Sequence, residues 1–132
     1  MLKQLLLPLM FTGLCYTLRA QTGSFTAQQT DSLSKVAELQ RLENIKTAAV
    51  TQFNYFVIKA DNNTFGYDVY ADGSLFIHQT TIPGLAGTNG FADTTTAGKT
   101  AQLVIAKIKK GVLPPVITSA DLQELGLLNT SK

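Results

Sequence analysis

Aromatic and β-branched residues dominate the stretch between positions 51 and 79, and two polar clusters interrupt it. Side chains of the first kind favour strands, whereas clusters of Asp, Asn and Gly favour turns. With turns at Asp61–Asn63 and Ala71–Gly73, the stretch predicts a three-stranded antiparallel meander, with a second strand over about Phe65–Tyr70 and a third over Ser74–Gln79. The first strand, which contains Phe53, is largely apolar on both faces, so we expect at least partial cover on both of its sides.

The second hairpin allows two registers. A two-residue turn at Asp72–Gly73 places Val69 opposite Phe76 and mixes polar with apolar side chains on each face. A three-residue loop at Ala71–Gly73, with a left-handed glycine, places Val69 opposite Leu75 and makes one face apolar. We prefer the three-residue loop, because a slip of one residue exposes the apolar set. This register also pairs Tyr67 with Ile77, and the outward face then carries Gly66, Asp68, Tyr70, Phe76 and His78.

Three helices are expected around the meander. In Asp31–Ala49, apolar residues recur every third position and drift around the helix surface, which is typical of a solvated or partner-dependent helix. A main helix starts near Asp93–Thr96 and ends at Gly111, with one apolar stripe that should pack on the sheet. Thr118 and Asp121 resemble a capping box for a short C-terminal helix. The fold class is therefore α+β, a small three-stranded meander packed against one main helix.

The first twenty residues have the features of a secretory signal peptide. A basic residue, Lys3, precedes a leucine-rich run, and the small residue Ala20 closes it. We expect cleavage after Ala20, export to the periplasm or the medium, and no membrane span in the mature chain. The domain scheme is then a signal peptide over 1–20, a variable and partly helical segment over 21–50, and an α+β domain over 51–128. The polar residues Gln21–Thr30 are expected to form a disordered lead-in.

Removal of the signal peptide changes the charge and the chemistry of the chain. The full sequence has eleven basic and nine acidic residues, and Lys3 and Arg19 belong to the leader. The mature chain is thus formally neutral, which argues against nucleic acid as a partner. The leader also holds the only cysteine, Cys15, so disulfides and thiolate metal sites are excluded from the mature chain. A single histidine, His78, excludes a multi-histidine metal site, and no cofactor is expected.

Two features carry possible chemistry. In the preferred register Asp68 lies diagonal to His78 on the outward face, where a carboxylate could orient the imidazole as a general base. A strand histidine bonded to a neighbour or to water is the favoured interpretation. The loop between the third strand and the main helix contains Gly84, Gly87 and Gly90. Backbone amides there could hold a phosphate, but a tight crossover from sheet to helix is favoured.

The outward face of the hairpin, with Tyr70, Phe76 and His78, is the more suggestive feature. If nothing covers it, the face is an amphipathic aromatic surface of the kind that marks interaction sites. The helix over Asp31–Ala49 is the alternative, as a cover for this face. The sequence leaves both possibilities open.

Several short motifs in the second half of the chain resemble a known family. They are Gly66-Tyr67-Asp68, Ile77-His78-Gln79, Ile82-Pro83, Gly87, Gly90-Phe91, a helix with Ala97 and Lys107, and Leu113-Pro114-Pro115 followed by Thr118 and Leu122. Over about Phe56 to Leu127, the chain is similar to a family of small exported bacterial proteins, typical of Bacteroidetes, known only as a domain of unknown function. The resemblance implies an envelope or secreted location and a compact shared domain, with no activity to carry over.

The leading hypothesis is a non-enzymatic binding or accessory module of the bacterial cell envelope, which binds an envelope protein or a glycan. A small hydrolase or isomerase that uses His78 with Asp68 is the alternative. A third hypothesis is pairing of the first or third strand with another protein's sheet. The candidate binding surface consists of Asp68, Tyr70, Phe76, His78, Gln79, Gly87 and Gly90; no metal site is expected.

Overall fold

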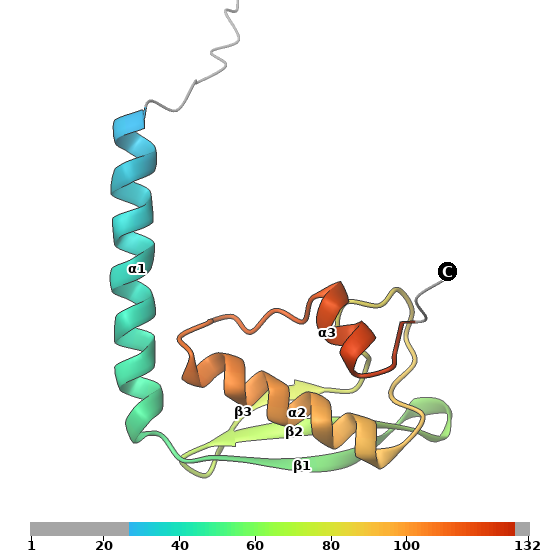
Figure 1. Cartoon of the computed structure of the whole chain (residues 1–132). Coiled ribbons are helices and arrows are strands. Elements are labelled where there is room, and N and C mark those ends of the chain that lie inside the picture. Colours follow the sequence, from blue (N-terminus) through green and yellow to red (C-terminus); the bar gives the residue numbers. More distant parts are fainter. Residues whose placement is uncertain (1–26, 129–132) are drawn as a thin grey trace, which may run out of the picture.

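The computed structural model describes residues 27–128, so the predicted signal peptide lies outside the described residues. Helices and strands follow in the expected order, helix, three strands, helix, helix (Figure 1). The α+β class is therefore confirmed. The elements are α1 (Ala27–Val50), β1 (Phe53–Ala60), a 3-10 turn η1 (Asp61–Asn63), β2 (Thr64–Ala71), β3 (Ser74–Gln79), α2 (Thr94–Lys109) and α3 (Ser119–Glu124).

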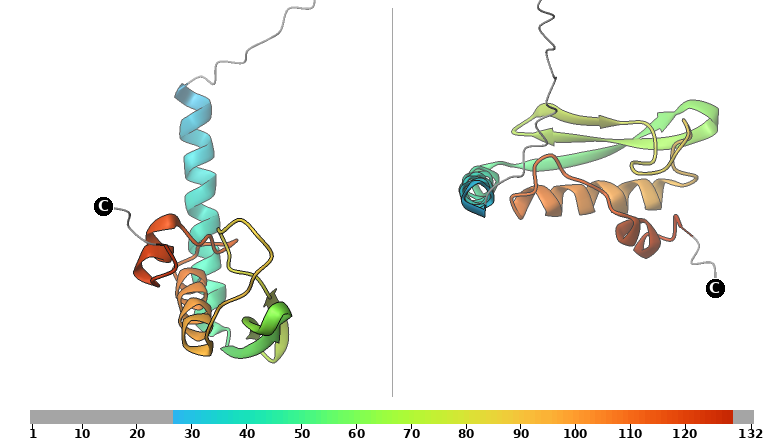
Figure 2. Two further views of the ribbon diagram at one scale, coloured as in Figure 1. Left: turned by 90° about the vertical axis from the view of Figure 1, so that its right-hand side faces the viewer. Right: turned by 90° about the horizontal axis from the view of Figure 1, so that it is seen from above.

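The sheet is an antiparallel meander in the order β1-β2-β3, and α2 lies along one of its faces (Figure 2). On the side that faces α2, Tyr55 of β1 pairs with Val69 of β2, and Val57 pairs with Tyr67. Because side chains alternate along a strand, the residues between them point to the opposite side. The other side of β1 is uncovered, with Phe56 59% exposed, so the expectation of cover on both faces of this strand is wrong.

The predicted register of the second hairpin is also wrong. The turn has two residues, Asp72 and Gly73, both with positive φ, and Ala71 pairs directly with Ser74. Two-residue turns of this hand match the natural twist of the strands. The extra residue is Phe76, which forms a bulge in β3 and shifts the register by one position.

Because of the bulge, the hairpin has one register near the turn and another farther along the strands. After the bulge, Val69 pairs with Ile77 on the side facing α2, and Asp68 pairs with His78 on the other side. Before the bulge, Leu75 pairs with Tyr70, so Leu75 is outward and 54% exposed instead of buried.

The core forms between the sheet and the apolar stripe of α2. Tyr67 and Val69 are almost completely buried against it, together with Phe91 at the end of the glycine-rich loop. Both helices are capped: Asp93 accepts a hydrogen bond from the amide of Thr96 at the start of α2, and Thr118 with Asp121 forms the predicted capping box of α3. The buried residues of α2 are Ala97, Gly98, Thr100, Ala101, Val104 and Ile108.

An ion pair holds α3 against α2. Lys107 Nζ lies 2.8 Å from Asp121 Oδ2, and the same carboxylate accepts bonds from the hydroxyl and amide of Thr118. Together these contacts lower the pKa of Asp121 to about 2, with the hydrogen bond from Lys107 as the largest cause. The docking of α3 thus combines the buried side chain of Leu122 with a charge-assisted polar contact.

Only the last turns of α1 contact the rest of the fold. Ala48 is buried, and Asn44 Nδ2 donates to the carbonyl of Gly111 just after α2, at 3.2 Å. The remainder of α1 projects away from the sheet (Figure 1), so this helix does not cover the outward face of the hairpin. The helix starts at Ala27, so the prediction of disorder up to Thr30 is wrong for the last four residues of that segment. Within residues 27–128, no helix has the length and apolarity needed to cross a membrane.

Two glycine-to-alanine substitutions should change stability in opposite directions. Gly98 lies inside α2, and an added Cβ there meets only ordinary contacts, 3.5 Å from Tyr55 at the nearest. Gly98→Ala should therefore raise the free energy of unfolding by about 0.5–1 kcal/mol, the helix-propensity gain. A Cβ added at Gly90 would lie 2.5 Å from the Phe65 carbonyl oxygen, which is too close. Gly90→Ala should therefore lower the free energy of unfolding by about 1–3 kcal/mol. Urea titrations of the two variants and the wild type measure both effects; a loss of stability in Gly98→Ala contradicts the packing described for α2.

Candidate functional site

The face of the sheet turned away from α2 is uncovered. We call it the outer sheet face. No other described element packs on it (Figure 2). The rings of Phe56 and Tyr70 lie edge to face across β1 and β2, with centroids 5.6 Å apart. The outer sheet face consists of Phe56, Ile58, Asp68, Tyr70, Leu75 and His78.

Asp68 and His78 form a hydrogen-bonded pair within this face. They are directly opposite in the ladder instead of diagonal as predicted, and His78 Nδ1 lies 2.6 Å from Asp68 Oδ1. The aspartate side chain is 14% exposed and the histidine side chain 57%. A carboxylate can only accept a hydrogen bond, so Nδ1 donates to Asp68, and Nε2 is left as an acceptor in the neutral form of the ring.

This pair has the geometry of a base and its orienting carboxylate. A general base also needs a substrate held within hydrogen-bond reach, which usually requires a concave site. Neither Asp68 nor His78 lines the cavity at the end of α1 or the groove beside β1, which are described below. The arrangement therefore presents an oriented hydrogen-bond acceptor on an open surface.

Of the predicted site residues, only Asp68, Tyr70 and His78 share the outer sheet face. Phe76 lies on the side facing α2, where its ring is 6.3 Å from that of Phe53. Its predicted place on the outward face is wrong, because the bulge reverses the direction of its side chain.

Gln79 and the glycines of the loop have structural roles. Gln79 Nε2 donates to the carbonyl and the hydroxyl of Thr81 at 2.7 and 3.1 Å. The amide of Gly90 donates to Thr64 Oγ1, and Phe65 exchanges two main-chain bonds with Phe91. Gly87, with φ of 116°, turns the chain in open space. The loop is thus pinned to the start of β2 as a crossover, and the amide of Gly90 is already engaged.

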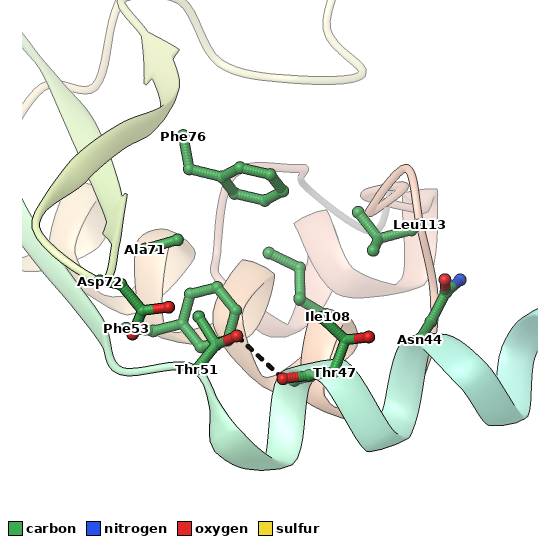
Figure 3. A pocket seen from close by; sticks show the side chains of 10 residues that line it. Asn44, Thr47, Thr51, Phe53, Ala71, Asp72, Phe76, Ile108 and Leu113 are labelled. Carbon is green, nitrogen blue, oxygen red and sulfur yellow. Dashed lines mark hydrogen bonds between the residues drawn. The ribbon is translucent and has the colours of Figure 1, made fainter.

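A cavity of about 260 Å³ lies where α1, the hairpin and the end of α2 meet (Figure 3). Apolar side chains form most of its wall. Two polar groups at its rim form hydrogen bonds within the protein: Thr51 Oγ1 donates to the Thr47 carbonyl, and an oxygen of Asp72 accepts from the amide of Gln52. No pattern in the sequence predicts this cavity, because its lining comes from three separated segments. The lining is Asn44, Thr47, Ala48, Thr51, Phe53, Ala71, Asp72, Phe76, Ile108 and Leu113.

Comparison with protein families gives one match. A family model described as "Domain of unknown function (DUF4907)" matches residues 57–124, just over half of the chain. The chain belongs to this family. The matched segment runs from within β1 to the end of α3, so it includes the Asp68–His78 pair and the glycine-rich loop, whereas α1 lies outside it. Neither the curated proteins nor the solved structures yield a match.

The position of the imidazole proton can be tested directly. In the wild type at neutral pH, we expect the proton of the neutral ring of His78 on Nδ1, because Asp68 accepts it. Asp68→Ala removes the acceptor and should shift the tautomer population toward Nε2–H. The ¹⁵N chemical shifts of the two ring nitrogens report both states. Asp61→Ala, at an exposed aspartate in the turn between β1 and β2, is the control and should leave the ring unchanged; the same ¹⁵N pattern in wild type and Asp68→Ala contradicts the pair.

Proposed function

We propose that this protein is a binding module whose outer sheet face contacts a partner in the bacterial cell envelope. The observation that carries the proposal is the exposure of Phe56 and Leu75, at 59% and 54%, on a sheet face that no described element covers. Contiguous apolar side chains on the surface of a small protein are typical of interaction sites.

The polar groups of the same face support a specific contact. The edge-to-face pair of Phe56 and Tyr70 fixes the aromatic surface, and the His78 ring beside it is oriented by Asp68. An interface of this kind combines an apolar centre with a few directed hydrogen bonds. An envelope protein or a glycan with donors at its surface fits these features.

The location in the envelope rests on the sequence of the leader. Lys3, the leucine-rich run and Ala20 match the order of a secretory signal peptide. Export predicts a mature N-terminus at Gln21 in protein recovered from a periplasmic or culture-medium fraction. Mass spectrometry of the N-terminal peptide checks it; a cytoplasmic protein that keeps Met1–Ala20 contradicts export.

The binding surface can be tested with two matched double variants. Phe56→Thr with Leu75→Thr removes the exposed apolar side chains of the outer sheet face but keeps β-branched residues in the strands. Val36→Gln with Leu39→Gln removes equally exposed side chains from the projecting part of α1. Wild type and both variants serve as baits for envelope extracts and for a polysaccharide array.

We expect the α1 variant to retain the partner of the wild type and the outer-face variant to bind at least about tenfold more weakly, the loss typical of an interface hot spot. His78→Gln should weaken binding by a smaller factor, because one hydrogen bond is lost. Equal binding by all the variants, in both the protein and the glycan arm, removes the proposed surface.

A further inference from the structure

The free edge of β1 is a second surface, distinct from the outer sheet face. β1 is an edge strand, since the sheet order is β1-β2-β3. The amide of Asp72 donates to the carbonyl of Gln52 at 2.9 Å, which extends the β1–β2 ladder by one pair. In an antiparallel ladder, the bonded pairs alternate along the strand. The main-chain groups of Phe56 therefore point toward β2, and those of Tyr55 and Val57 point away from the sheet.

Nothing in the described part of the chain pairs with this edge through its main chain. Proteins usually protect an edge strand with proline, bulges, several charges or a covering element. β3, the other edge, is short and bulged at Phe76. β1 is eight residues long, pairs regularly with β2, and has Lys59 as its only charged residue. Of the two edges, β1 is the better template for another strand.

A groove runs between this edge and the N-terminal half of α2. Its volume is about 490 Å³. Gly98 keeps it open, because a glycine there brings no side chain toward Tyr55. Gln102 Nε2 donates to the Tyr55 hydroxyl at 2.8 Å, which joins the helix to the strand at one point. The groove is lined by Tyr55, Val57, Thr94, Thr95, Gly98, Lys99 and Gln102.

The one charged residue in the lining of the groove is basic. Lys99 lines it, and Lys59 lies on the same face of β1 as Tyr55 and Val57, by the alternation of the strand. Neither lysine forms an ion pair within residues 27–128. Asp93, near Lys99, already caps α2 through bonds to Thr96. An acidic segment complements these lysines, whereas a second copy of β1 has no acidic residue to pair with them.

We propose that the β1 edge and α2 together bind an extended acidic peptide segment, which adds to the sheet as a fourth strand. Its main chain bonds to the outward groups of Tyr55 and Val57, and alternate side chains enter the groove beside Gly98. A carboxylate of the segment pairs with Lys99. In strand addition, main-chain bonds supply affinity and the side-chain pockets supply specificity. This site goes beyond the proposed function, because it uses the opposite side of β1 and α2.

The first test compares two synthetic octapeptide pools. Both pools have β-branched residues at most positions, and two fixed positions hold Glu in one pool and Lys in the other. In ¹⁵N-NMR titrations of the purified protein, we expect the Glu pool to shift the amide signals of Tyr55, Val57 and Lys99 and to bind at least about tenfold more tightly than the Lys pool. Lys99→Glu should reverse the preference. Lys109→Glu, an exposed position in the last turn of α2, is the matched control and should keep it.

The second test isolates the main-chain bonds. Peptides from the Glu pool are N-methylated at alternate residues, either on the edge that faces β1 or on the opposite edge. Methylation on the facing edge should abolish binding, and methylation on the opposite edge should leave it within about twofold, because only the facing amides donate to β1.

Four outcomes overturn the proposal. They are no binding by either pool, equal binding by both pools, equal effects of both methylation patterns, and amide shifts confined to the outer sheet face. A second copy of the chain is the other possible occupant of the β1 edge, and analytical ultracentrifugation tests for it. If the wild type forms a dimer that Val57→Pro disrupts, and the circular dichroism of the variant matches the wild type, the edge pairs with a second copy. That result also overturns the proposal.

Discussion

The packing of α2 on one face of the sheet is the contact on which the rest of the structure depends. One helix buries Tyr67 and Val69 on the inner side of β2, where the core is almost fully enclosed. Within residues 27–128 no second long helix is available for the other side, because α1 contacts the end of α2 and then projects away. With one layer of helix for a sheet that is apolar on both sides, an exposed apolar face is unavoidable. The outer sheet face is exposed because only one helix packs on the sheet, and not because of any local feature of β1 or β2.

The bulge at Phe76 decides which side chains that exposed face receives. It leaves Leu75 outward and brings His78 directly opposite Asp68. A regular two-residue hairpin would put His78 opposite Tyr67 and so on the inner side with the core, where an unpaired imidazole is costly to bury. One inserted residue thus keeps the core apolar and creates the only carboxylate–imidazole pair in residues 27–128. Phe76 itself turns inward and forms a wall of the small cavity beside Phe53.

Elements with a local chemical signal could be predicted from the sequence, and those set by tertiary contact could not. The start of α2 near Asp93, the Thr118–Asp121 capping box and the stripe of α2 depend on residues within a few positions of one another, and all are present. The prediction of the hairpin register was wrong because two arrangements each use one residue more than a regular two-residue hairpin. They are a three-residue loop and a two-residue turn with a bulge. Only the twist of the strands selects between them. The cavity and the groove beside β1 also lacked a signal, since their walls come from segments that meet only in the folded chain.

The family match excludes α1 and includes all or part of every other helix and strand. The match starts at Val57 and ends at Glu124, and the buried core apart from Ala48, the glycine-rich crossover and α3 all lie within it. α1 adds the buried side chain of Ala48 and its bond to Gly111, while Leu33, Val36, Leu39 and Leu42 remain exposed. A solvent-exposed helix gains little from its surface ion pairs, such as Glu38 with Arg41. The stability of the sheet and α2 should therefore depend weakly on the projecting turns of α1. Because neither the outer sheet face nor the β1 groove includes a residue of α1, both surfaces belong to the compact part of the fold.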